Sequence, residues 1–210
     1  MLAATSLDTV MLAGLTGSDP DMRVRGSSAD ATGAAGDIFD SGTISGIPYF
    51  DPNYGMFVYA RDTPLAPRYL RIDASEAGVD AIAAGRLGVW ARNAFTWNMQ
   101  TPWVRTAVRG SVDQIGVGGQ TFTDLRYGHW RQSIRINFAS ETERTSFLDA
   151  IGIAIVNRGN LDIMLMPNPE STNLSRDCIF GYIEGEFTLT QDLYTLEPVF
   201  SVEFVIRQRR

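Results

Sequence analysis

The segment Gly128–Ala139 constrains the fold of this chain more than any other stretch of its sequence. Two sets of side chains alternate strictly along it: one set is Trp130, Gln132, Ile134, Ile136 and Phe138, and the other is Arg131, Ser133, Arg135 and Asn137. Alternation with a period of two predicts a β-strand that is buried on one face and exposed on the other. A long strand against a hydrophobic core is therefore predicted here.

A helix is predicted directly after this strand, over Ser140–Val156. Ser140 and Glu143 have the spacing of a capping box, in which each side chain accepts a hydrogen bond from the other residue's backbone N–H. Apolar residues follow at helical spacing, and Asn157-Arg158-Gly159 supplies a cationic last turn and a left-handed cap. Because this helix has a single apolar stripe, we expect it to pack against the sheet.

Three further strands are predicted to complete the C-terminal part of the chain: Leu161–Met166, Ile179–Leu189 and Val199–Arg207. A polar loop over Pro167–Arg176 connects the first two. Gly181 and Gly185 indicate that the second strand bends or is closely approached by another element. The predicted fold class is therefore α+β and mostly β, in which residues 127–210 form a bent antiparallel sheet or small barrel packed by one helix (about 140–157).

Residues 54–126 are predicted to form a β-rich segment, a possible sandwich-like insertion. Short candidate strands at Met56–Ala60, Arg68–Asp73 and Ala81–Trp90 are each bounded by Gly, Pro or Asp. Short strands at regular spacing are typical of a β-sandwich or a barrel.

Residues 1–53 are predicted to form an extended, glycine-rich N-terminal arm. Gly26–Gly46 contains mostly small and polar residues, a composition that favours a flexible segment when it stands alone. If such a segment is ordered, we expect another subunit to hold it in place. Ile38, Phe39 and Ile44 are then its candidate inter-subunit contacts, because they are its few large apolar residues.

The composition excludes several classes of site. The 210 residues include one cysteine and one histidine, which excludes an internal disulfide and any metal site made of several cysteines or histidines. A formal net charge of −6 disfavours bulk electrostatic binding of nucleic acid. No apolar run reaches the roughly 18–20 residues that span a bilayer. We therefore expect no metal, no cofactor, no sequence-specific nucleic acid and no membrane span.

Few residue combinations resemble a catalytic site. Glu184 and Glu186 could form a carboxylate pair as in glycosidases. The opposite face of the strand holds Ile183, Phe187 and Leu189, which favours two solvent-facing glutamates instead. Gly116–Gly119 lacks the Gly-Lys-Ser/Thr of a phosphate loop and favours a hairpin turn. His129 and Cys178 have no identifiable catalytic partners, which favours packing roles. The chain is predicted not to be an enzyme.

Aromatic residues gather in the middle segment, where Trp90, Trp97 and Trp103 are the most prominent. Exposed indoles can stack on sugar rings, whereas cores and subunit interfaces use the same residues for burial. Two interpretations therefore stay open for these tryptophans: core or interface packing, and a platform for carbohydrate.

Two stretches of the sequence resemble a known family. The first comprises Arg68-Tyr-Leu-Arg-Ile-Asp73, then Gly78, then Ala81-Ile-Ala-Ala-Gly-Arg-Leu-Gly-Val-Trp90, and is similar to the pattern RYxRIxxxD…GxIxIGRLxxG in tail proteins of long-tailed bacteriophages. The second runs from Tyr127 to the end: a strand ending in Phe, a helix with Phe-Leu, a strand closing on Met-x-Pro, and a long closing hairpin. It resembles the distal segment of the same proteins.

The resemblance implies a virion structural protein of the distal tail (Dit-like) or tail-tip type, with the barrel found in tail-tube proteins. Such a protein forms a homo-oligomeric ring, expected to be hexameric, that joins the tail tube to the host-recognition tip. The implied partners are the tail tube protein, other tail-tip or baseplate hub proteins and the tape measure protein, with a host surface glycan as a further candidate. The implied location is the virion tail tip, after synthesis in the cytoplasm of the host bacterium.

Two alternatives to this function stay open. The chain could be a carbohydrate-binding module of the tail tip, or it could be a tail tube or terminator protein.

Overall fold

A computed structural model describes residues 6–51, 54–95, 104–115, 117, 119–124, 126–152, 162–168, 170–192 and 199–209. The chain divides into two compact units. The first unit comprises Met1–Asn93 and Asn168–Cys178 with Arg210, and the second comprises Ala94–Pro167 and Ile179–Arg209. The described residues are mostly in β-strands, with short helices beside them, so the predicted α+β, mostly β fold class is confirmed.

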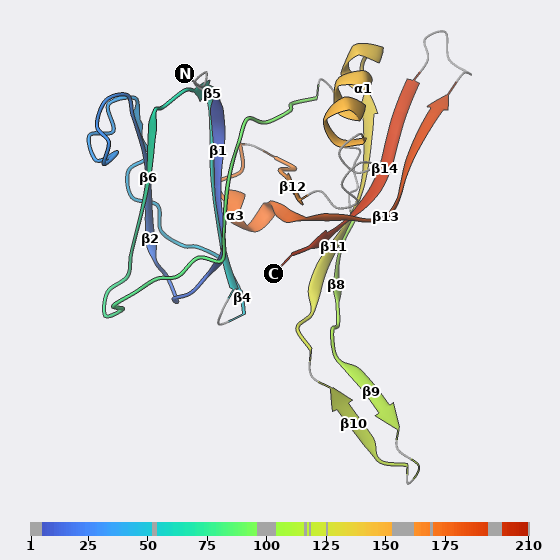
Figure 1. Cartoon of the computed structure of the whole chain (residues 1–210). Coiled ribbons are helices and arrows are strands. Elements are labelled where there is room, and N and C mark those ends of the chain that lie inside the picture. Colours follow the sequence, from blue (N-terminus) through green and yellow to red (C-terminus); the bar gives the residue numbers. More distant parts are fainter. Residues whose placement is uncertain are drawn as a thin grey trace. The chain divides into compact units, whose positions relative to one another are not determined.

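The first unit is a sandwich of two antiparallel sheets (Figure 1). One sheet has the order β4-β5-β1-β7 and consists of β4 (Tyr49–Asp51), β5 (Tyr54–Leu65), β1 (Leu7–Leu15) and β7 (Arg86–Trp90). The other has the order β3-β2-β6 and consists of β3 (Phe39–Asp40), β2 (Asp21–Ser27) and β6 (Tyr69–Ser75). Buried side chains from both sheets form one core between them: Val10, Leu12, Leu15, Met22, Val24, Phe39, Ile47 and Phe57.

The first unit includes the whole described part of the predicted N-terminal arm, which differs from the boundary expected at residue 53. Strand β1 lies between β5 and β7 and is buried along almost its entire length. Its sequence, LDTVMLAGL, is a nearly continuous apolar run, as expected for a strand that is covered on both faces. Gly26–Gly46 has few apolar side chains to bury, but the residues before it include a strand that is almost completely buried.

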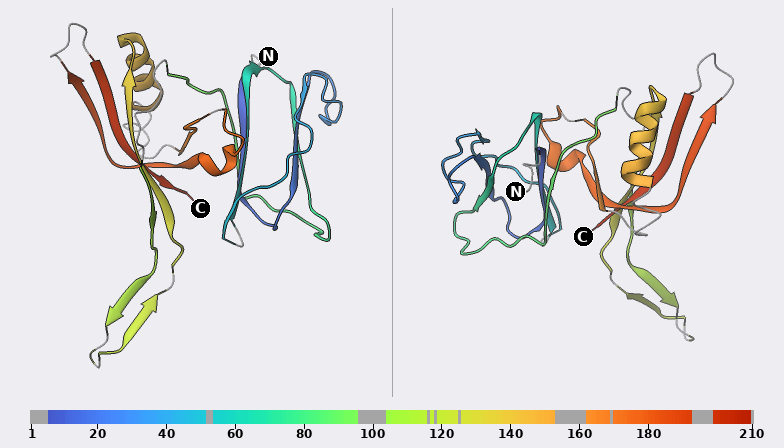
Figure 2. Two further views of the ribbon diagram at one scale, coloured as in Figure 1. Left: turned by 180° about the vertical axis from the view of Figure 1, so that it is seen from behind. Right: turned by 45° about the horizontal axis from the view of Figure 1, so that its top comes forward.

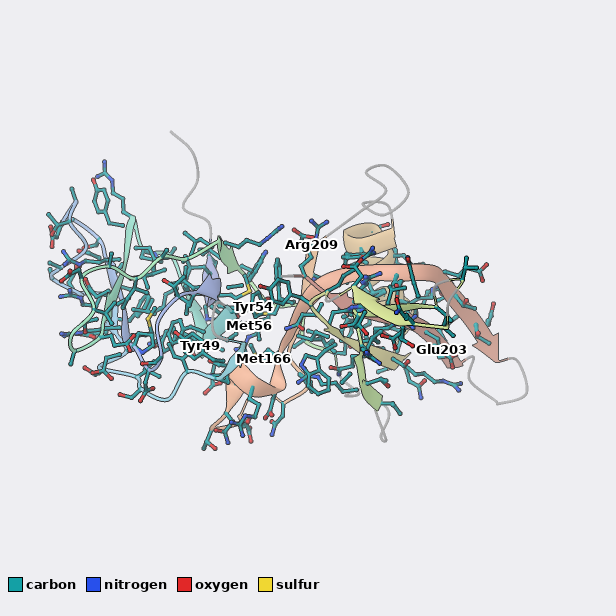
Figure 3. All side chains as sticks on the ribbon, turned by 90° about the horizontal axis from the view of Figure 1, so that it is seen from below. Tyr49, Tyr54, Met56, Met166, Glu203 and Arg209 are labelled. Atoms are coloured by element: carbon teal, nitrogen blue, oxygen red, sulfur yellow. The ribbon has the colours of Figure 1, made fainter. Side chains whose placement is uncertain are left out.

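Figure 3 labels three residues where β4 meets β5. The ring of Tyr49 lies over Gly55, because a Cβ at Gly55 would fall 2.7 Å from that ring. Tyr54 and Met56, on either side of Gly55, are buried. A glycine at this position therefore lets an aromatic side chain lie flat on the strand.

A short segment from the C-terminal half of the sequence completes the first unit. Helix α3 (Leu174–Asp177) contacts β5, and the Val58 N–H donates a 2.9 Å hydrogen bond to Ser175 Oγ. Cys178 follows with 1 % of its surface exposed, as predicted for a small buried residue. The predicted polar loop over Pro167–Arg176 thus contains a helical turn that covers backbone groups of β5.

The second unit is built on a curled five-stranded antiparallel sheet with the order β12-β13-β14-β11-β8 (Figure 1). Its strands are β12 (Asp162–Leu165), β13 (Ile179–Asp192), β14 (Val199–Gln208), β11 (His129–Phe138) and β8 (Val104–Val108). The helix α1 (Glu141–Phe147) covers one face and continues as a π-helical turn, η1 (Leu148–Gly152). The core on that face contains Ile134, Ile136, Phe138, Phe147, Ile179, Phe200, Val202, Phe204 and Ile206.

Helix α1 begins as the capping-box pattern predicts. The Glu143 N–H donates to Ser140 Oγ at 3.2 Å, and Glu143 Oε2 accepts a 2.7 Å hydrogen bond from the Ala139 N–H. The return bond of the glutamate thus falls one residue earlier than in the standard box. The last four residues of the predicted helix, after Gly152, lie outside the described residues.

Strand β13 bends at the glycines that the sequence singled out. The register with β14 shifts between Glu184 and Thr188, and Gly185 has a φ of +80°, which is accessible mainly to glycine. At Gly181 the β14 backbone approaches so closely that any Cβ would collide with the Arg207 carbonyl. A bulge of this kind turns a long strand and curls the sheet.

Candidate functional site

Of the two carboxylates considered for catalysis, Glu184 binds arginines instead. Glu184 Oε2 lies 2.6 Å from Arg131 Nε, and its Oε1 lies 3.2 Å from Arg207 Nη1. Glu186 is exposed and lies in the irregular part of β13, beyond Gly185. On the same outward face, Glu203 pairs with Arg135 at 3.2 Å (Figure 3). These contacts are those of an ion-pair ladder along a sheet, with no nucleophile and acid facing one another.

The other candidate polar residues also have local partners. His129 lies at the start of β11, opposite Val108 of β8. Gly116–Gly119 connects two antiparallel strands, as expected of a hairpin turn, although Gly116 and Gly118 themselves lie outside the described residues. Within the part of the chain that the structure describes, no three metal-ligating side chains come together.

Of the three candidate tryptophans, the structure describes one. Trp90 ends β7 and is half-buried, and its indole lies over Gly88, where any Cβ would collide with the ring. Trp97 and Trp103 lie outside the described residues. The structure therefore brings no group of tryptophans together in its described part.

Ile38, Phe39 and Ile44, the candidate inter-subunit contacts, pack against the core of the first unit, and their contact with another copy stays a prediction. Phe39 is 5 % exposed and stacks on Tyr59 with ring centroids 6.1 Å apart. Ile44 exchanges two backbone hydrogen bonds with Met22, at 2.7 and 2.8 Å, and both isoleucines pack against the core. The chain itself supplies the burial that we expected from a neighbour.

Polar contacts within the same chain hold the small-residue loop Ser28–Asp37 (the pinned loop). The carboxylate of Asp37 accepts hydrogen bonds from the hydroxyls of Ser27 and Ser28, which lower its pKa to about 2. Asp30 accepts from the backbone N–H of Ala35 at 2.8 Å. These bonds connect both ends of the loop, so it is ordered with almost no apolar burial of its own.

Glycine allows the pinned loop to lie directly on the outer face of the β3-β2-β6 sheet. Gly33 has a φ of +69°, and a Cβ there would fall 2.7 Å from the Cβ of Arg71. The guanidinium of Arg25 donates to the Ala34 carbonyl at 2.6 Å and also pairs with Asp73 at 2.6 Å. Small residues in the loop therefore permit a close backbone approach to a layer of charged side chains.

The feature that the sequence analysis missed is a projecting hairpin in the second unit. Strands β9 (Val112–Ile115) and β10 (Thr121–Asp124) pair only with each other among the described residues. With their turn they form the hairpin arm, residues 112–124, which extends the β8–β11 pair well beyond the five-stranded sheet (Figures 1 and 2). Every residue of β9 is exposed.

The hairpin arm, its base and strand β8, which leads into it, together carry most of the exposed large apolar side chains of the described chain. Val112, Ile115 and Val117 on the arm are 41 %, 78 % and 111 % exposed. Tyr127 at the base is 74 % exposed, and Val104, at the end of β8 that is remote from the arm, is 55 % exposed. These are five of the nine exposed large apolar residues in the described chain. Soluble monomers rarely concentrate apolar surface in this way unless another molecule covers it.

Charges on the hairpin arm are confined to its base. Arg109 lies 3.3 Å from Asp113, and Arg126 lies 2.7 Å from Asp124. From Gln114 to Thr123 the sequence contains no charged residue. The distal part of the arm is thus an uncharged strand pair, and neither of its outer edges pairs with another strand among the described residues.

The sheet of the second unit also has open edges near the arm and opposite it. In the described part of the chain, β12 pairs with β13 only from Ile179 to Tyr182, so the rest of β13 has no strand on its outer side. On the other side, β8 pairs with β11 only from His129 to Ser133. Open backbone edges of this length are sites where another strand can add.

No family model matches this chain, and no curated protein or solved structure is similar to it. Among the described residues, no helix is both long enough and apolar enough to cross a membrane.

Proposed function

We propose that this chain is a virion structural protein, a ring-forming subunit at the distal end of a long-tailed phage tail. The proposal rests on the resemblance of Arg68–Arg92 and Tyr127–Arg207 to phage tail proteins and on the hairpin arm. The observation that carries it is the exposure of apolar side chains on that arm. The protein would act by assembly, so no residue is assigned a catalytic or cofactor-binding role.

The arm suits contact with another copy because its apolar residues gain little in a monomer. Fully burying a side chain such as Ile115 or Val117 stabilises by roughly 1.5–3 kcal/mol. The two open edges of the arm can also add backbone hydrogen bonds to a neighbouring sheet. A subunit interface would use both contributions together.

The arrangement of the sheet favours a head-to-tail contact. The arm extends from the β8–β11 side of the sheet, and the unpaired stretch of β13 lies on the opposite side. A contact between two different surfaces repeats from copy to copy and closes into a ring when the rotation allows it. The six-fold symmetry, the virion location, and the tail tube, hub and tape measure partners come from the resemblance alone and belong to this proposal.

The test is a charge placed on the arm. We expect the wild-type protein to form rings at assembly concentrations and Ile115→Asp to form none, because burying the new carboxylate in the arm contact costs more free energy than the contact contributes. Gln114→Asp is the matched control: it adds the same charge at the neighbouring exposed position without removing apolar surface. Native mass spectrometry and negative-stain imaging measure the assembly. A strictly monomeric wild-type protein, also in the presence of tail tube, would contradict the proposal.

A carbohydrate-binding module is the second candidate, favoured by the flat placement of the Trp90 indole over Gly88. Glycan arrays with the wild-type protein and Trp90→Ala distinguish this candidate from the first. Binding that the substitution abolishes while assembly is unchanged would support it. Co-sedimentation with tail tube or with tail-tip proteins separates a tail-tip subunit from a tube or terminator protein.

A further inference from the structure

Strand β7 is the outer strand of the four-stranded sheet in the first unit. It pairs with β1 from Arg86 to Trp90 and, among the described residues, with no other strand. Natural sheets protect such edges with charge, proline, a bulge or a covering element, because an open edge can pair with another strand. The only charged residue of β7 is Arg86, at its first position.

On the side of the sheet that faces the core, the aliphatic side chains of β7 are exposed to solvent in the described chain. Leu87 is opposite Leu12 in the register and Val89 is opposite Val10, so these side chains lie on the same face as the core residues of β1. Leu12 and Val10 are 9 % and 1 % exposed, whereas Leu87 and Val89 are 60 % and 37 % exposed. The hydrophobic face of the sandwich thus continues past the last strand with nothing in the described chain covering it.

We propose that β7 pairs antiparallel with β7 of a second copy of this chain, around a two-fold axis at Gly88. This register pairs all five residues of the strand. It places Leu87 opposite the second copy's Val89, and Arg86 opposite the second copy's Trp90. Each copy thereby covers the aliphatic side chains that the other leaves exposed, and the two four-stranded sheets join into one.

A second copy fits this edge better than an unrelated strand because β7 is complementary to itself. The order Arg-Leu-Gly-Val-Trp, read against its own reverse, matches aliphatic with aliphatic and a guanidinium with an indole. No like charges face one another, and cross-strand aliphatic and cation–π pairs are both favourable. At the axis Gly88 meets Gly88, so no Cβ competes with the indole of Trp90 that lies over this position.

This pairing is separate from the proposed ring contact. It uses the first unit and a self-complementary surface, whereas the hairpin arm belongs to the second unit and contacts a different surface. Because β7 has five residues, we expect weak, concentration-dependent dimerisation. The two contacts can therefore fail independently, and the substitutions that test them do not overlap.

The experiment measures dimerisation of the full chain by analytical ultracentrifugation over a wide concentration series. Leu87→Lys and Val89→Glu should each abolish the dimer, since each places a charge opposite an aliphatic side chain in both halves of the interface. An equimolar mixture of the two variants should dimerise again. In the mixed dimer, Lys at 87 faces Glu at 89, and the other half keeps its wild-type pair.

Two controls separate this contact from others. Val79→Lys replaces another exposed aliphatic residue of the first unit, 40 % exposed, and should leave the dimer unchanged. Ile115→Asp disables the hairpin arm and should also leave it unchanged. Three results would overturn the proposal: a wild-type protein that stays monomeric throughout the series, a Leu87→Lys protein that dimerises normally, or loss of the dimer in Ile115→Asp, which would assign the edge to the arm.

Discussion

The pinned loop and the hairpin arm are opposites in composition and in structure. The pinned loop contains small and polar residues, yet it is held in place by hydrogen bonds that Asp30 and Asp37 accept and that Arg25 donates. The arm contains apolar residues, yet its strand β9 is fully exposed. An apolar segment is therefore not always internal, and a segment with little to bury can be ordered by polar contacts alone. What matters is whether the chain supplies the partner.

The largest expected effect is on the free energy of unfolding, for a substitution in the segment that follows the pinned loop. Phe39→Ala should lower the free energy of unfolding by about 3–5 kcal/mol, because it removes a buried ring from a packed core. Chemical denaturation of the full chain measures this effect. A change near zero would mean that the segment after the pinned loop is held by something other than the first unit's core.

A smaller loss is expected from filling the close approach beneath the pinned loop. Gly33→Ala should destabilise by about 1–2 kcal/mol for its positive φ, and by more because the new Cβ would contact Arg71. Gly42→Ala is the matched control: its φ is +66°, and nothing lies within 4 Å of the added Cβ. Thermal unfolding of the two variants should separate the conformational cost from the steric one. Equal losses would contradict the close contact.

The pinned loop should also loosen in acid. Hydrogen bonds from Ser27 and Ser28 lower the pKa of Asp37 from its ordinary 3.8 to about 2, so folding favours its ionised form. This stabilisation is complete above the higher value and is lost as the pH falls from about 4 toward 2. The protection of the Ser28 amide against hydrogen exchange, relative to an unstructured amide at the same pH, should fall over that interval, and Asp37→Asn should show lower protection already at neutral pH. A variant with unchanged exchange would show that Asp37 does not hold the loop.

The smallest effect on stability is expected in the arm. Ile115→Ala should change the free energy of unfolding by no more than about 0.5 kcal/mol, because the side chain is 78 % exposed. The same substitution should weaken self-assembly measurably at limiting protein concentration. If unfolding were strongly affected, the arm would be packed within its own chain, and the contrast with the pinned loop would disappear.

The C-terminal strands were predictable because their patterns are local. Alternation in β11 and β14 places Ile134, Phe138 and Phe204 in the core, and the box at Ser140 starts the helix where expected. The pinned loop was not predictable, since its contacts join Asp37 to Ser27 and Ala34 to Arg25, pairs that no local pattern identifies. Strand β1 was not predicted, because the glycine-rich composition of the residues after it led us to assign all of residues 1–53 to an extended arm.

The candidate assembly surface was missed for a different reason. In the sequence, Val112 and Ile115 look like core residues of a short strand. Whether they are exposed depends on which other strands lie beside them, and the sequence pattern does not show this. The pairing of β8 with β11 stops at Val108. The next two strands, β9 and β10, lie beyond the five-stranded sheet and pair only with each other in the described chain. Sequence patterns report which face of a strand is apolar and not whether that face is covered.

The segment Asn168–Cys178 has a consequence for how this gene can be divided. It lies between two strands of the second unit, but belongs to the first unit and caps Val58. A fragment ending at Asn93 would leave that backbone group uncovered, and a fragment starting at Ala94 would contain an orphaned helical turn. Recombination between Asn93 and Ala94 would therefore transfer the first unit without its segment Asn168–Cys178. The two units are expected to be inherited, expressed and engineered as one piece.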